Sequence, residues 1–351
     1  MNNKDILIDE NSTILEALKR ISSVRDISRL ILFVSSSDNK IIGSVTDGDI
    51  RRALIKGFSL DTEIKEICFN DFIFRYESED YIELNSLTKG ENSIKILPLL
   101  FKDKTLSRII DLEKYKSLLP VECVIMSGGR GKRLSPLTDS IPKPMLPISG
   151  KPIIEHNIDK LISYGIKKIH ISIGYLGNQI IDYFGDGSKK GIQINYIKED
   201  KPLGTAGSLS LIKNIKSDNI ILINSDLFTN VNYERMYLNL LNNNADIVIA
   251  SKDYKVDIPF AIFESDNFEI NSFKEKPSYT FPSNAGIYIF KKKLISMIPK
   301  NTFYDITDLM QDVILKEGKL IHDPIVGYWI DIGKIEDYNK AKEFSKQFDW
   351  C

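Results

Sequence analysis

Short apolar runs alternate with amphipathic stretches of helical spacing along the chain after residue 120. Runs of this kind between turn residues are typical of buried strands, and apolar positions three and four residues apart are typical of helices that face a core. Their alternation predicts an α/β fold with a Rossmann-like, mostly parallel sheet and helices on both faces. The predicted strands are 123–126, 168–173, 192–197, 220–223, 245–250 and 285–290, and the predicted helices are 152–164 and 176–184.

The first third of the chain shows a weak internal repeat of one β-β-α unit. The predicted elements are helices at 14–21 and 49–54 and strands at 30–34 and 41–45, followed by a looser copy with a helix at 81–87 and strands at 94–101 and 106–110. One such unit cannot bury both of its faces, so we expect two copies to pack together. A linker at 114–120 would then separate a domain at 1–118 from a second domain at 121–351.

Composition and charge narrow the classes of partner. The chain has 351 residues, enough for two domains, and its 47 Lys and Arg residues almost balance 48 Asp and Glu residues. This balance predicts neither a nucleic-acid nor a membrane partner. The three cysteines are far apart and do not cluster with the histidines, which argues against disulfide and zinc sites. No apolar run approaches the roughly 20 residues of a membrane span, and no signal peptide is evident, so we expect a cytoplasmic protein.

A glycine-rich loop, Ser127-Gly-Gly-Arg-Gly-Lys-Arg133, follows the first strand predicted in the second domain. Ligands bind beyond the carboxyl ends of strands in such sheets. The glycines let the backbone approach a phosphate, and successive N–H groups can form an anion-binding nest. The spacing matches neither the dinucleotide fingerprint nor the P-loop. Downstream, Pro142 and Pro144 hold Lys143 in a stiff, extended segment near this loop.

The run from Gly128 to Pro147 resembles the signature of the sugar-phosphate nucleotidyltransferases, whose fold is GT-A-like, and the likeness continues over about 121–342. The resemblance implies that Arg133 grips the triphosphate of the nucleotide and that Lys143 neutralises charge at the reacting phosphorus. It also implies Asp226 and Asp331 as ligands of a Mg²⁺ cofactor, for which two carboxylates with phosphate oxygens and waters are suited. The alternative is that Asp226 caps a helix and Asp331 a turn.

The nucleotide side of the site is implied by the same resemblance. Pro202-Leu-Gly-Thr-Ala-Gly207 is similar to the loop beneath the base, and Glu199 matches the position that meets the base edge. A carboxylate accepts two N–H donors, which guanine offers and uracil or thymine does not, so Glu199 favours GTP. A solvated charge is the alternative. The implied nucleotide-binding residues are Ser127, Gly128, Gly129, Gly131, Lys132, Glu199, Gly204 and Thr205.

The sugar-phosphate side resembles the family at Glu275-Lys-Pro277 and Asn284-Ala-Gly286. By this resemblance Lys276 holds the acceptor phosphate and also acts in catalysis, while Glu275 and Asn284 bind sugar hydroxyls. Gly286 belongs to the same group. One departure occurs at Ala261, where many relatives have Gly, and it leaves the pose of the sugar open.

The first third resembles a tandem pair of CBS modules, best at Gly43-Ser-Val-Thr-Asp-Gly-Asp49. The resemblance implies that Thr46 and Asp49 contact the phosphates and ribose of an adenine nucleotide. The second copy carries Ile110 and Glu113 in these two places, so one regulatory nucleotide site at most is expected per pair. A pathway product is another candidate ligand, and a purely structural or dimerising role is the alternative.

The motifs together are most similar to mannose- and heptose-phosphate guanylyltransferases. With the CBS module, they resemble the glucosamine-1-phosphate guanylyltransferases of bacterial legionaminic acid synthesis, which supply GDP-glucosamine for flagellin glycosylation. This implies a homo-oligomeric enzyme that joins GTP to a sugar 1-phosphate and releases pyrophosphate. A uridylyl- or thymidylyltransferase is the first alternative. A nucleotide-sensing CBS protein with an inactive transferase domain is the second, and the joint presence of five implied catalytic residues argues against it. These are Arg133, Lys143, Asp226, Lys276 and Asp331.

Overall fold

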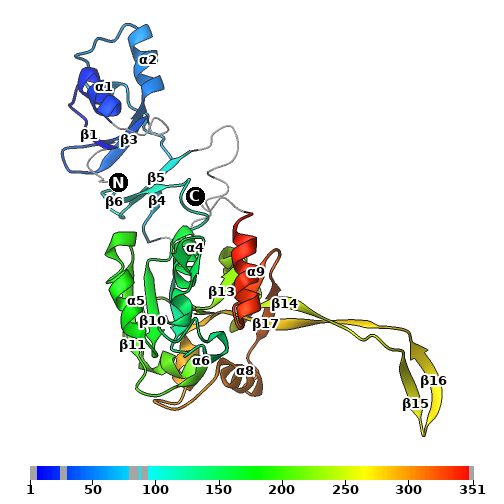
Figure 1. Ribbon diagram of the computed structural model, residues 1–351. Helices are drawn as coiled ribbons and strands as arrows, with labels where there is room; N and C mark the ends of the chain where they lie inside the picture. Colours follow the sequence, from blue (N-terminus) through cyan, green and yellow to red (C-terminus); the bar gives the residue numbers. More distant parts are fainter. Residues whose placement is uncertain (1–5, 24–29, 79–86, 88–93, 348–351) are drawn as a thin grey trace. The chain divides into compact units, whose positions relative to one another are not determined.

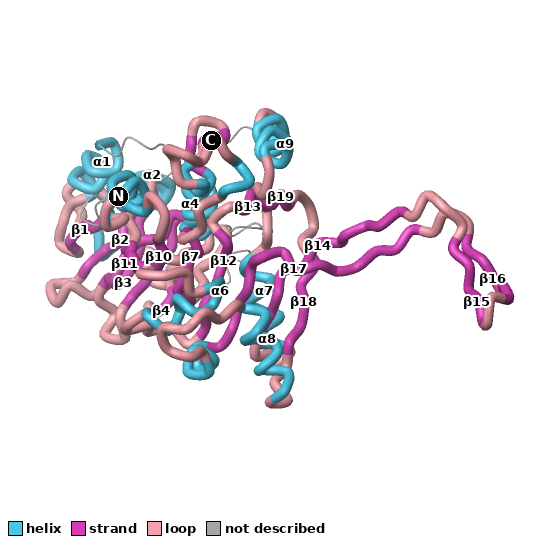
Figure 2. Tube along the Cα trace, turned by 60° about the horizontal axis from the view of Figure 1, so that its bottom comes forward, coloured by secondary structure: helices cyan, strands magenta, loops and turns pink. Residues whose placement is uncertain are grey.

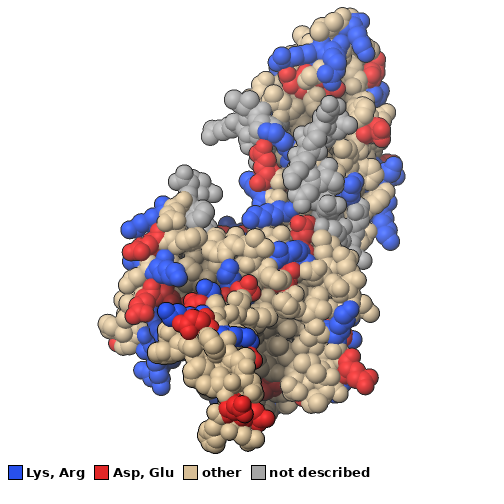
Figure 3. Space-filling view, turned by 90° about the vertical axis from the view of Figure 1, so that its right-hand side faces the viewer, with Lys and Arg blue, Asp and Glu red and all other residues tan. Residues whose placement is uncertain are grey.

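The computed structural model describes residues 6–23, 30–78, 87 and 94–347. The chain divides into two compact units, Met1–Leu118 and Leu119–Cys351, and this boundary lies inside the linker expected from the sequence. Positive and negative side chains are interspersed over the face shown in Figure 3, as the nearly balanced charge suggests. In the described ranges, no helix has both the length and the apolar character needed to cross a membrane.

The first unit contains two three-stranded sheets of the same topology. In the orders β1-β2-β3 and β4-β5-β6, the first pair of strands is parallel and the second pair is antiparallel. This agrees with the predicted internal repeat, although the helix predicted at 81–87 lies outside the described residues apart from Leu87. The elements are β1 (Leu7–Asp9), α1 (Ile14–Ser23), β2 (Ile31–Ser35), β3 (Ile41–Thr46), α2 (Asp47–Ile55), η3 (Ile64–Glu66), β4 (Arg75–Tyr76), β5 (Ile96–Leu100) and β6 (Leu106–Asp111).

The second unit is built on a seven-stranded sheet of order β11-β10-β7-β12-β17-β14-β18, whose strands are labelled in Figure 2. The strands β11, β10, β7 and β12 are parallel, β17 is antiparallel to both neighbours, and β14 and β18 are parallel. The mostly parallel sheet predicted from the sequence is therefore confirmed. The strands are β7 (Val121–Ser127), β10 (Lys168–Ile173), β11 (Gln193–Lys198), β12 (Asn219–Asn224), β14 (Ile247–Asp257), β17 (Ser278–Lys291) and β18 (Leu320–Pro324).

Helices and short strands complete the second unit. They are η4 (Lys132–Leu134), η5 (Lys143–Met145), β8 (Pro147–Ile148), β9 (Lys151–Pro152), α4 (Ile153–Ser163), α5 (Gly177–Phe184), η6 (Ser188–Lys190), α6 (Gly204–Gly207), η7 (Ser208–Leu211), β13 (Leu227–Thr229), α7 (Tyr233–Asn242), β15 (Ile262–Asp266), β16 (Glu269–Lys274), η8 (Lys292–Met297), α8 (Ile306–Leu315), β19 (Trp329–Asp331) and α9 (Ile335–Ser345). Helix α4 begins after Pro152 and ends before Gly165, as the sequence predicts.

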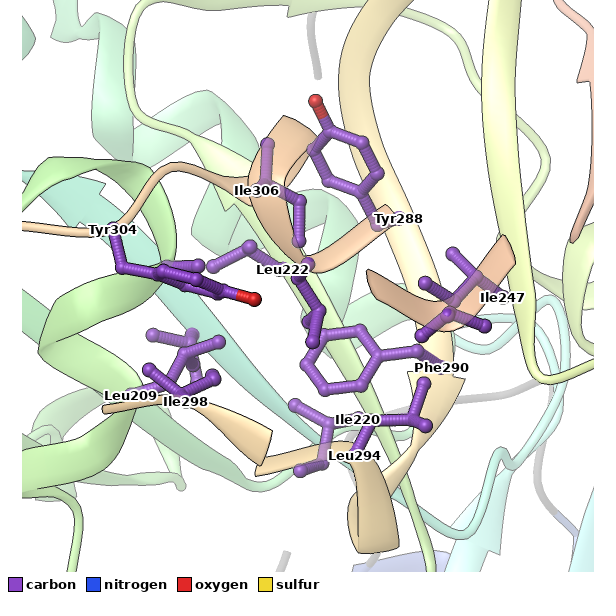
Figure 4. Close-up of a cluster of buried hydrophobic side chains, with 14 of the residues drawn as sticks. Leu209, Ile220, Leu222, Ile247, Tyr288, Phe290, Leu294, Ile298, Tyr304 and Ile306 are labelled. Carbon is purple, nitrogen blue, oxygen red and sulfur yellow. The ribbon is translucent and has the colours of Figure 1, made fainter. Parts of the chain in front are cut away.

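Apolar side chains cover the sheet on both faces. On one face, Ile220, Leu222 and Phe290 pack under α8 in the cluster shown in Figure 4. Side chains alternate between the faces of a strand, so Cys123 points to the other face from Val124. On that other face, α7 packs against β14 and β17 and brings the buried ring of Tyr233 near Cys123.

Strands β14 and β17 continue beyond the sheet as a two-stranded ribbon that carries the hairpin β15–β16 (Figures 1 and 2). We call residues 252–283 the arm. Both strands are longer than predicted, since the sequence indicated only 245–250 and 285–290. A register shift between Ile249 and Ser251 marks the place where the ribbon leaves the sheet.

Candidate active site

The carboxyl ends of four parallel strands meet at one edge of the sheet. Ser127 at the end of β7 pairs with Ile173 of β10, and Met126 pairs with Asn224 of β12. The segments after these strands enclose a cavity of about 740 Å³. Of the residues predicted for the site, those that line it are Ser127, Gly128, Gly129, Gly131, Lys132, Arg133, Lys143, Glu199, Gly204, Thr205 and Asp226.

At Gly131 the glycine-rich loop approaches its neighbours too closely for a side chain. Gly131 has φ +64°, and a Cβ there would lie 3.0 Å from the Cβ of Lys143. The hydroxyl of Thr138 donates to the Gly131 carbonyl at 2.9 Å. The loop after β10 comes equally close, because a Cβ on Gly174 would lie 2.6 Å from the Gly128 oxygen. The backbone thus forms the wall of the cavity, as expected for a phosphate-binding loop.

Lys143 and Asp226 form an ion pair inside the cavity, with side chains only 12% and 22% exposed. Asp226 Oδ1 and Ser127 Oγ are buried and have no hydrogen-bond partner among the described residues. Buried polar atoms without partners are rare in native proteins and call for a ligand or water. The strand β13 begins at Leu227 and the cap of α7 is Asn232, so Asp226 caps no helix.

Asp331 adds a second carboxylate beside the first. In the pairing of β13 with β19, Asp331 lies opposite Leu227, which is the residue after Asp226. Desolvation of the carboxyl group and the charge of Asp226 raise the pKa of Asp331, although Lys143 and Arg133 act to lower it. Asp331 is exposed and does not line the cavity, but Asp226, Lys143 and Arg133 lie close enough to influence the pKa of its carboxyl group. The guanidinium of Arg133 lies over Gly333, where a Cβ would be 3.5 Å from Nη1.

The pair of carboxylates fits a magnesium ion by its chemistry. Mg²⁺ prefers oxygen ligands and is usually held by one or two carboxylates, with waters and substrate phosphates in the other positions. Within the described ranges no cluster of three or more potential metal-binding side chains occurs, so a fully protein-made cage is not present. The unpartnered Oδ1 of Asp226 supplies a free oxygen for this purpose.

Glu199 is held by the protein on both oxygens. The hydroxyl of Ser172 donates to Oε1, and the N–H of Leu203 donates to Oε2 at 3.1 Å. Glu199 is therefore half-buried and fixed rather than a free solvated charge. Each oxygen of a carboxylate has a further lone pair, so these two contacts leave room for donors from a ligand.

The loop beneath the predicted base position packs against the start of α8. Gly204 has φ +77°, and a Cβ there would lie 2.8 Å from Asp305 Oδ1. The N–H of Thr205 donates to the same oxygen at 2.9 Å, and its hydroxyl accepts from Ile306 N at 2.8 Å. Thr205 and Asp305 therefore fix the loop to the helix.

Sequence reasoning missed several residues that line the cavity. Asp305 and Phe303 come from a segment about a hundred residues after the loop that they face, and only the capping pattern before 306 gave a signal there. Tyr175 also lines the cavity, and the Arg130 guanidinium lies 5.2 Å from the centre of its ring. Tyr175 lies two residues after the end of β10, so the rule that ligands bind at carboxyl ends would have found it.

The residues predicted for the sugar phosphate do not line this cavity. Glu275 and Lys276 lie on the arm, between β16 and β17, and Ala261 lies on it as well. Asn284 lies at the base of the arm, where its Oδ1 accepts the N–H of Gly286 at 3.0 Å. Gly286 packs in turn against Asn224, because a Cβ there would lie 2.6 Å from Asn224 Nδ2.

The two residues predicted for a regulatory nucleotide belong to the first unit and cap α2. The N–H of Asp49 donates to Thr46 Oγ1 at 3.2 Å, and Asp49 Oδ2 accepts from Thr46 N at 2.8 Å. Arg52 Nη2 donates to Asp49 Oδ1 at 2.5 Å. Burial would raise the pKa of Asp49, but these hydrogen bonds and the charge of Arg52 lower it overall. A structural role as a helix cap is thus evident for both.

Known proteins match both units. The nucleotidyl transferase family matches residues 122–347, and the CBS domain family matches residues 1–56. The bifunctional protein GlmU of Methanococcus maripaludis is 32% identical over 61% of this chain and 51% of its own length. The mannose-1-phosphate guanylyltransferase of Mycobacterium tuberculosis is 30% identical over 62% of each chain. The matched part of this chain thus spans 51% to 62% of the length of these relatives.

Solved structures agree with the fold. HddC from Yersinia pseudotuberculosis is 32% identical, with a TM-score of 0.51 over 64% of this chain and 99% of its own. The same protein has been solved as a complex with GMP-PN, which matches with a TM-score of 0.50. The family match covers well over half of the chain and includes the whole cavity. The chain therefore belongs to the nucleotidyl transferase family and carries a CBS domain in its amino-terminal unit.

Proposed function

We propose that the chain is a sugar-1-phosphate guanylyltransferase that joins GTP to glucosamine 1-phosphate and releases pyrophosphate. The observation that carries the proposal is the charged cluster under the glycine-rich loop. Lys143 and Asp226 are paired there, and the buried Ser127 Oγ and Asp226 Oδ1 lack partners among the described residues. Such atoms are suited to a phosphate-rich ligand and its counterion.

The reaction needs no nucleophilic side chain. A phosphate oxygen of the sugar 1-phosphate attacks the α-phosphorus of the nucleotide, and a new P–O bond forms. The bond from the α-phosphorus to the bridging oxygen breaks, and pyrophosphate leaves with the electron pair. The protein contributes by positioning and by neutralising charge, with Arg133 at the triphosphate and Lys143 at the reacting phosphorus.

Asp226 and Asp331 would hold the magnesium ion, which when bound neutralises charge on the phosphate oxygens. Lys143 pairs with Asp226. With a cation held by Asp226 and Asp331, the Lys143 ammonium would be available to the phosphates, and no charge inside the cavity would be left uncompensated.

Glu199 supports guanine as the base. Its position at the carboxyl end of β11 is fixed by Ser172 and Leu203, and a fixed carboxylate is suited to the two N–H donors of guanine. The guanylyltransferase among the relatives agrees with this choice. A UTP–glucose-1-phosphate uridylyltransferase of Synechocystis is also 30% identical over 247 residues, so a uridylyltransferase is the alternative.

Glucosamine 1-phosphate, and a place in legionaminic acid synthesis and flagellin glycosylation, are proposed from the resemblance of the combined architecture. The CBS domain match at residues 1–56 supports this architecture. We also propose that residues 1–118 act as a regulatory tandem CBS pair that binds an adenine nucleotide or a pathway product near Thr46 and Asp49. Calorimetry with AMP, ATP and the GDP-sugar tests this, and absence of heat with all three would refute it.

The experiment that tests the function measures pyrophosphate release with magnesium, for GTP, UTP, dTTP and CTP against glucosamine, mannose and glucose 1-phosphates. Release with GTP and glucosamine 1-phosphate alone is the expected result. Release with UTP or dTTP would keep the reaction and reject the role given to Glu199. Absence of pyrophosphate release with every combination would favour a nucleotide-sensing protein with an inactive transferase unit.

A further inference from the structure

The stem of the arm is apolar on one face. Tyr254 and Val256 of β14 lie directly opposite Phe281 and Tyr279 of β17. Residues two apart on a strand share a face, so these four side chains form one surface. The other face of the stem is polar and carries Asp253, Lys255, Asp257, Ser278 and Thr280.

The tip of the arm repeats this asymmetry. Phe263 of β15 lies directly opposite Phe273 of β16. The alternate positions carry Glu264, Ser272 and Lys274, and the Lys274 ammonium pairs with Glu264 at 2.9 Å. The arm therefore has the one-sided pattern of a sheet that packs on another surface.

That apolar face is open in the described part of the chain. The exposed fractions are 63% for Tyr254, 55% for Phe281, 59% for Phe263 and 65% for Phe273. A two-stranded ribbon is only marginally stable alone in water, and a contiguous exposed apolar surface is characteristic of an interface. Both views of the backbone show the arm standing away from the sheet that bears it (Figures 1 and 2).

The arm also carries Glu275 and Lys276, which are predicted to bind the sugar phosphate. Strand β17 is antiparallel to β12, so the arm leaves the sheet at the edge where the cavity lies. From Asn284 to Ser278 the ladder runs roughly 20 Å outward. Lys276 lies beyond it, in a left-handed turn with φ +45°, and among the described residues no group of opposite charge pairs with it. Lys276 therefore cannot reach the cavity of its own chain while the stem stays paired.

We propose that two copies of the chain exchange arms, so that each arm lies across the cavity of the other copy and brings Lys276 to the sugar phosphate. This rests on the function proposed above. The partner is a second copy because a copy of this chain offers the cavity in which the proposed function needs Glu275 and Lys276. Exchange of one element between identical chains closes as a twofold dimer.

A foreign partner and an arm folded back onto its own chain both agree less well with these observations. A foreign protein on the apolar face would leave every cavity without Lys276. Folding the arm back onto its own cavity would break the ladder that runs from the Ser251–Asn284 pair to the Asp257–Ser278 pair. The available area also suits a dimer. An aromatic side chain can bury about 150–250 Å², and reciprocal burial of two arms approaches the roughly 1,000 Å² of a specific interface.

Mixed dimers test the exchange. Lys276→Ala and Asp226→Asn should each lower pyrophosphate release by tenfold or more. When the two variants are coexpressed, one cavity of each mixed dimer combines an intact body with an intact arm. About one quarter of wild-type activity should then return. Lys255→Ala, on the polar face, is the matched control and should keep full activity. A mixture no more active than its separate components overturns the exchange, as does full activity of Lys276→Ala alone.

A second measurement does not depend on catalysis. Chains with Lys276→Cys and chains with Lys132→Cys, at the cavity, are coexpressed, and the purified mixture is treated with a short bis-maleimide. A product of twice the chain mass is expected from the mixture but from neither variant alone, nor from wild type. Absence of this product overturns the exchange even if the enzyme is active. Failure of the proposed function would instead show as the expected crosslink between the two cysteine variants together with wild-type protein that releases no pyrophosphate.

Discussion

At the scale of single residues, the structure joins groups that the sequence indicated only as separate motifs. Lys143 lies between two prolines and Asp226 follows a strand end about 80 residues later, yet the two form one ion pair. Removing one partner from a largely buried pair leaves an uncompensated charge and is strongly unfavourable. Replacement of one carboxylate oxygen of Asp226 by nitrogen should therefore be enough to impair the function of this pair.

Asp226→Asn is expected to lower pyrophosphate release by about 100-fold or more, in line with losses of one electrostatic group in other enzymes. The substitution keeps the shape of the side chain and removes its charge. Asp218→Asn is the matched control, because Asp218 is 95% exposed and lies outside the cavity. Steady-state assays check this, and a loss below tenfold would contradict the role of Asp226.

Substitutions at two glycines distinguish the cost of a left-handed backbone from the cost of a close contact. Gly204 and Gly150 have nearly equal φ values, +77° and +79°, but only Gly204 has Asp305 and Tyr304 against it. Gly150→Ala should destabilise the protein by about 1 kcal/mol through its left-handed conformation. Gly204→Ala should destabilise it by clearly more and also weaken GTP binding. Urea denaturation and calorimetry measure both, and equal effects of the two variants would show that the contact is unimportant.

At the scale of elements, a buried charged group connects β7 to β10. Glu122 accepts from His170 Nε2 at 2.8 Å, and Lys168 lies 3.2 Å from the same oxygen. Lys216 N donates to the other oxygen at 2.7 Å. Burial lowers the pKa of His170 more than the hydrogen bond to Glu122 raises it. His170 is therefore neutral, and Lys168 supplies the positive charge.

Acid should weaken these strands. The folded pKa of His170 lies below its usual 6.5, so the unfolded chain binds more protons and stability is lost as the pH falls below that value. The loss has a limiting slope of about 1.4 kcal/mol per pH unit. In His170→Gln the free energy of unfolding should decline less between pH 7 and 5, as measured in urea. Parallel curves for the two proteins would contradict this.

The apolar runs predict the existence of β14 and β17 but not their lengths. The apolar-run criterion finds strands that are buried on both faces, and it correctly placed the parts of β14 and β17 inside the sheet. In the arm, apolar and charged residues alternate, as at Tyr254, Lys255 and Val256. Such alternation is typical of a strand with one exposed face, which the apolar-run criterion does not detect, and the long-range pairing establishes the strand.

At the scale of the whole molecule, the two units should respond to different ligands. GTP at about 100 times its dissociation constant stabilises the unit that binds it by about 2.7 kcal/mol. For a unit of this size the transition should rise by about 5–10 °C. Differential scanning calorimetry should show this shift for Leu119–Cys351 and none for Met1–Leu118. A uniform shift of both transitions would mean that the units unfold together.

The position of the cavity is predictable because ligands bind at the carboxyl ends of parallel strands. Residues after parallel strands meet at one edge, and this rule indicates the loop at Ser127; Glu199 and Asp226, which the family resemblance implies, also lie just after strands of this sheet. Asp305 and Phe303 follow no strand of the sheet. They reach the cavity through the packing of α8 against the loop at Gly204, and a single sequence contains no signal for that contact.

The one-sided apolar arm also has a consequence during synthesis. Residues 252–283 leave the ribosome before β18 and α9 exist, so an uncovered apolar ribbon is present while the chain is still growing. The Glu264–Lys274 and Lys255–Asp257 ion pairs on its other face oppose stacking of ribbons into fibrils. Nascent chains on neighbouring ribosomes of one messenger RNA would be the first partners available. This favours dimer assembly during translation over association of released chains by diffusion.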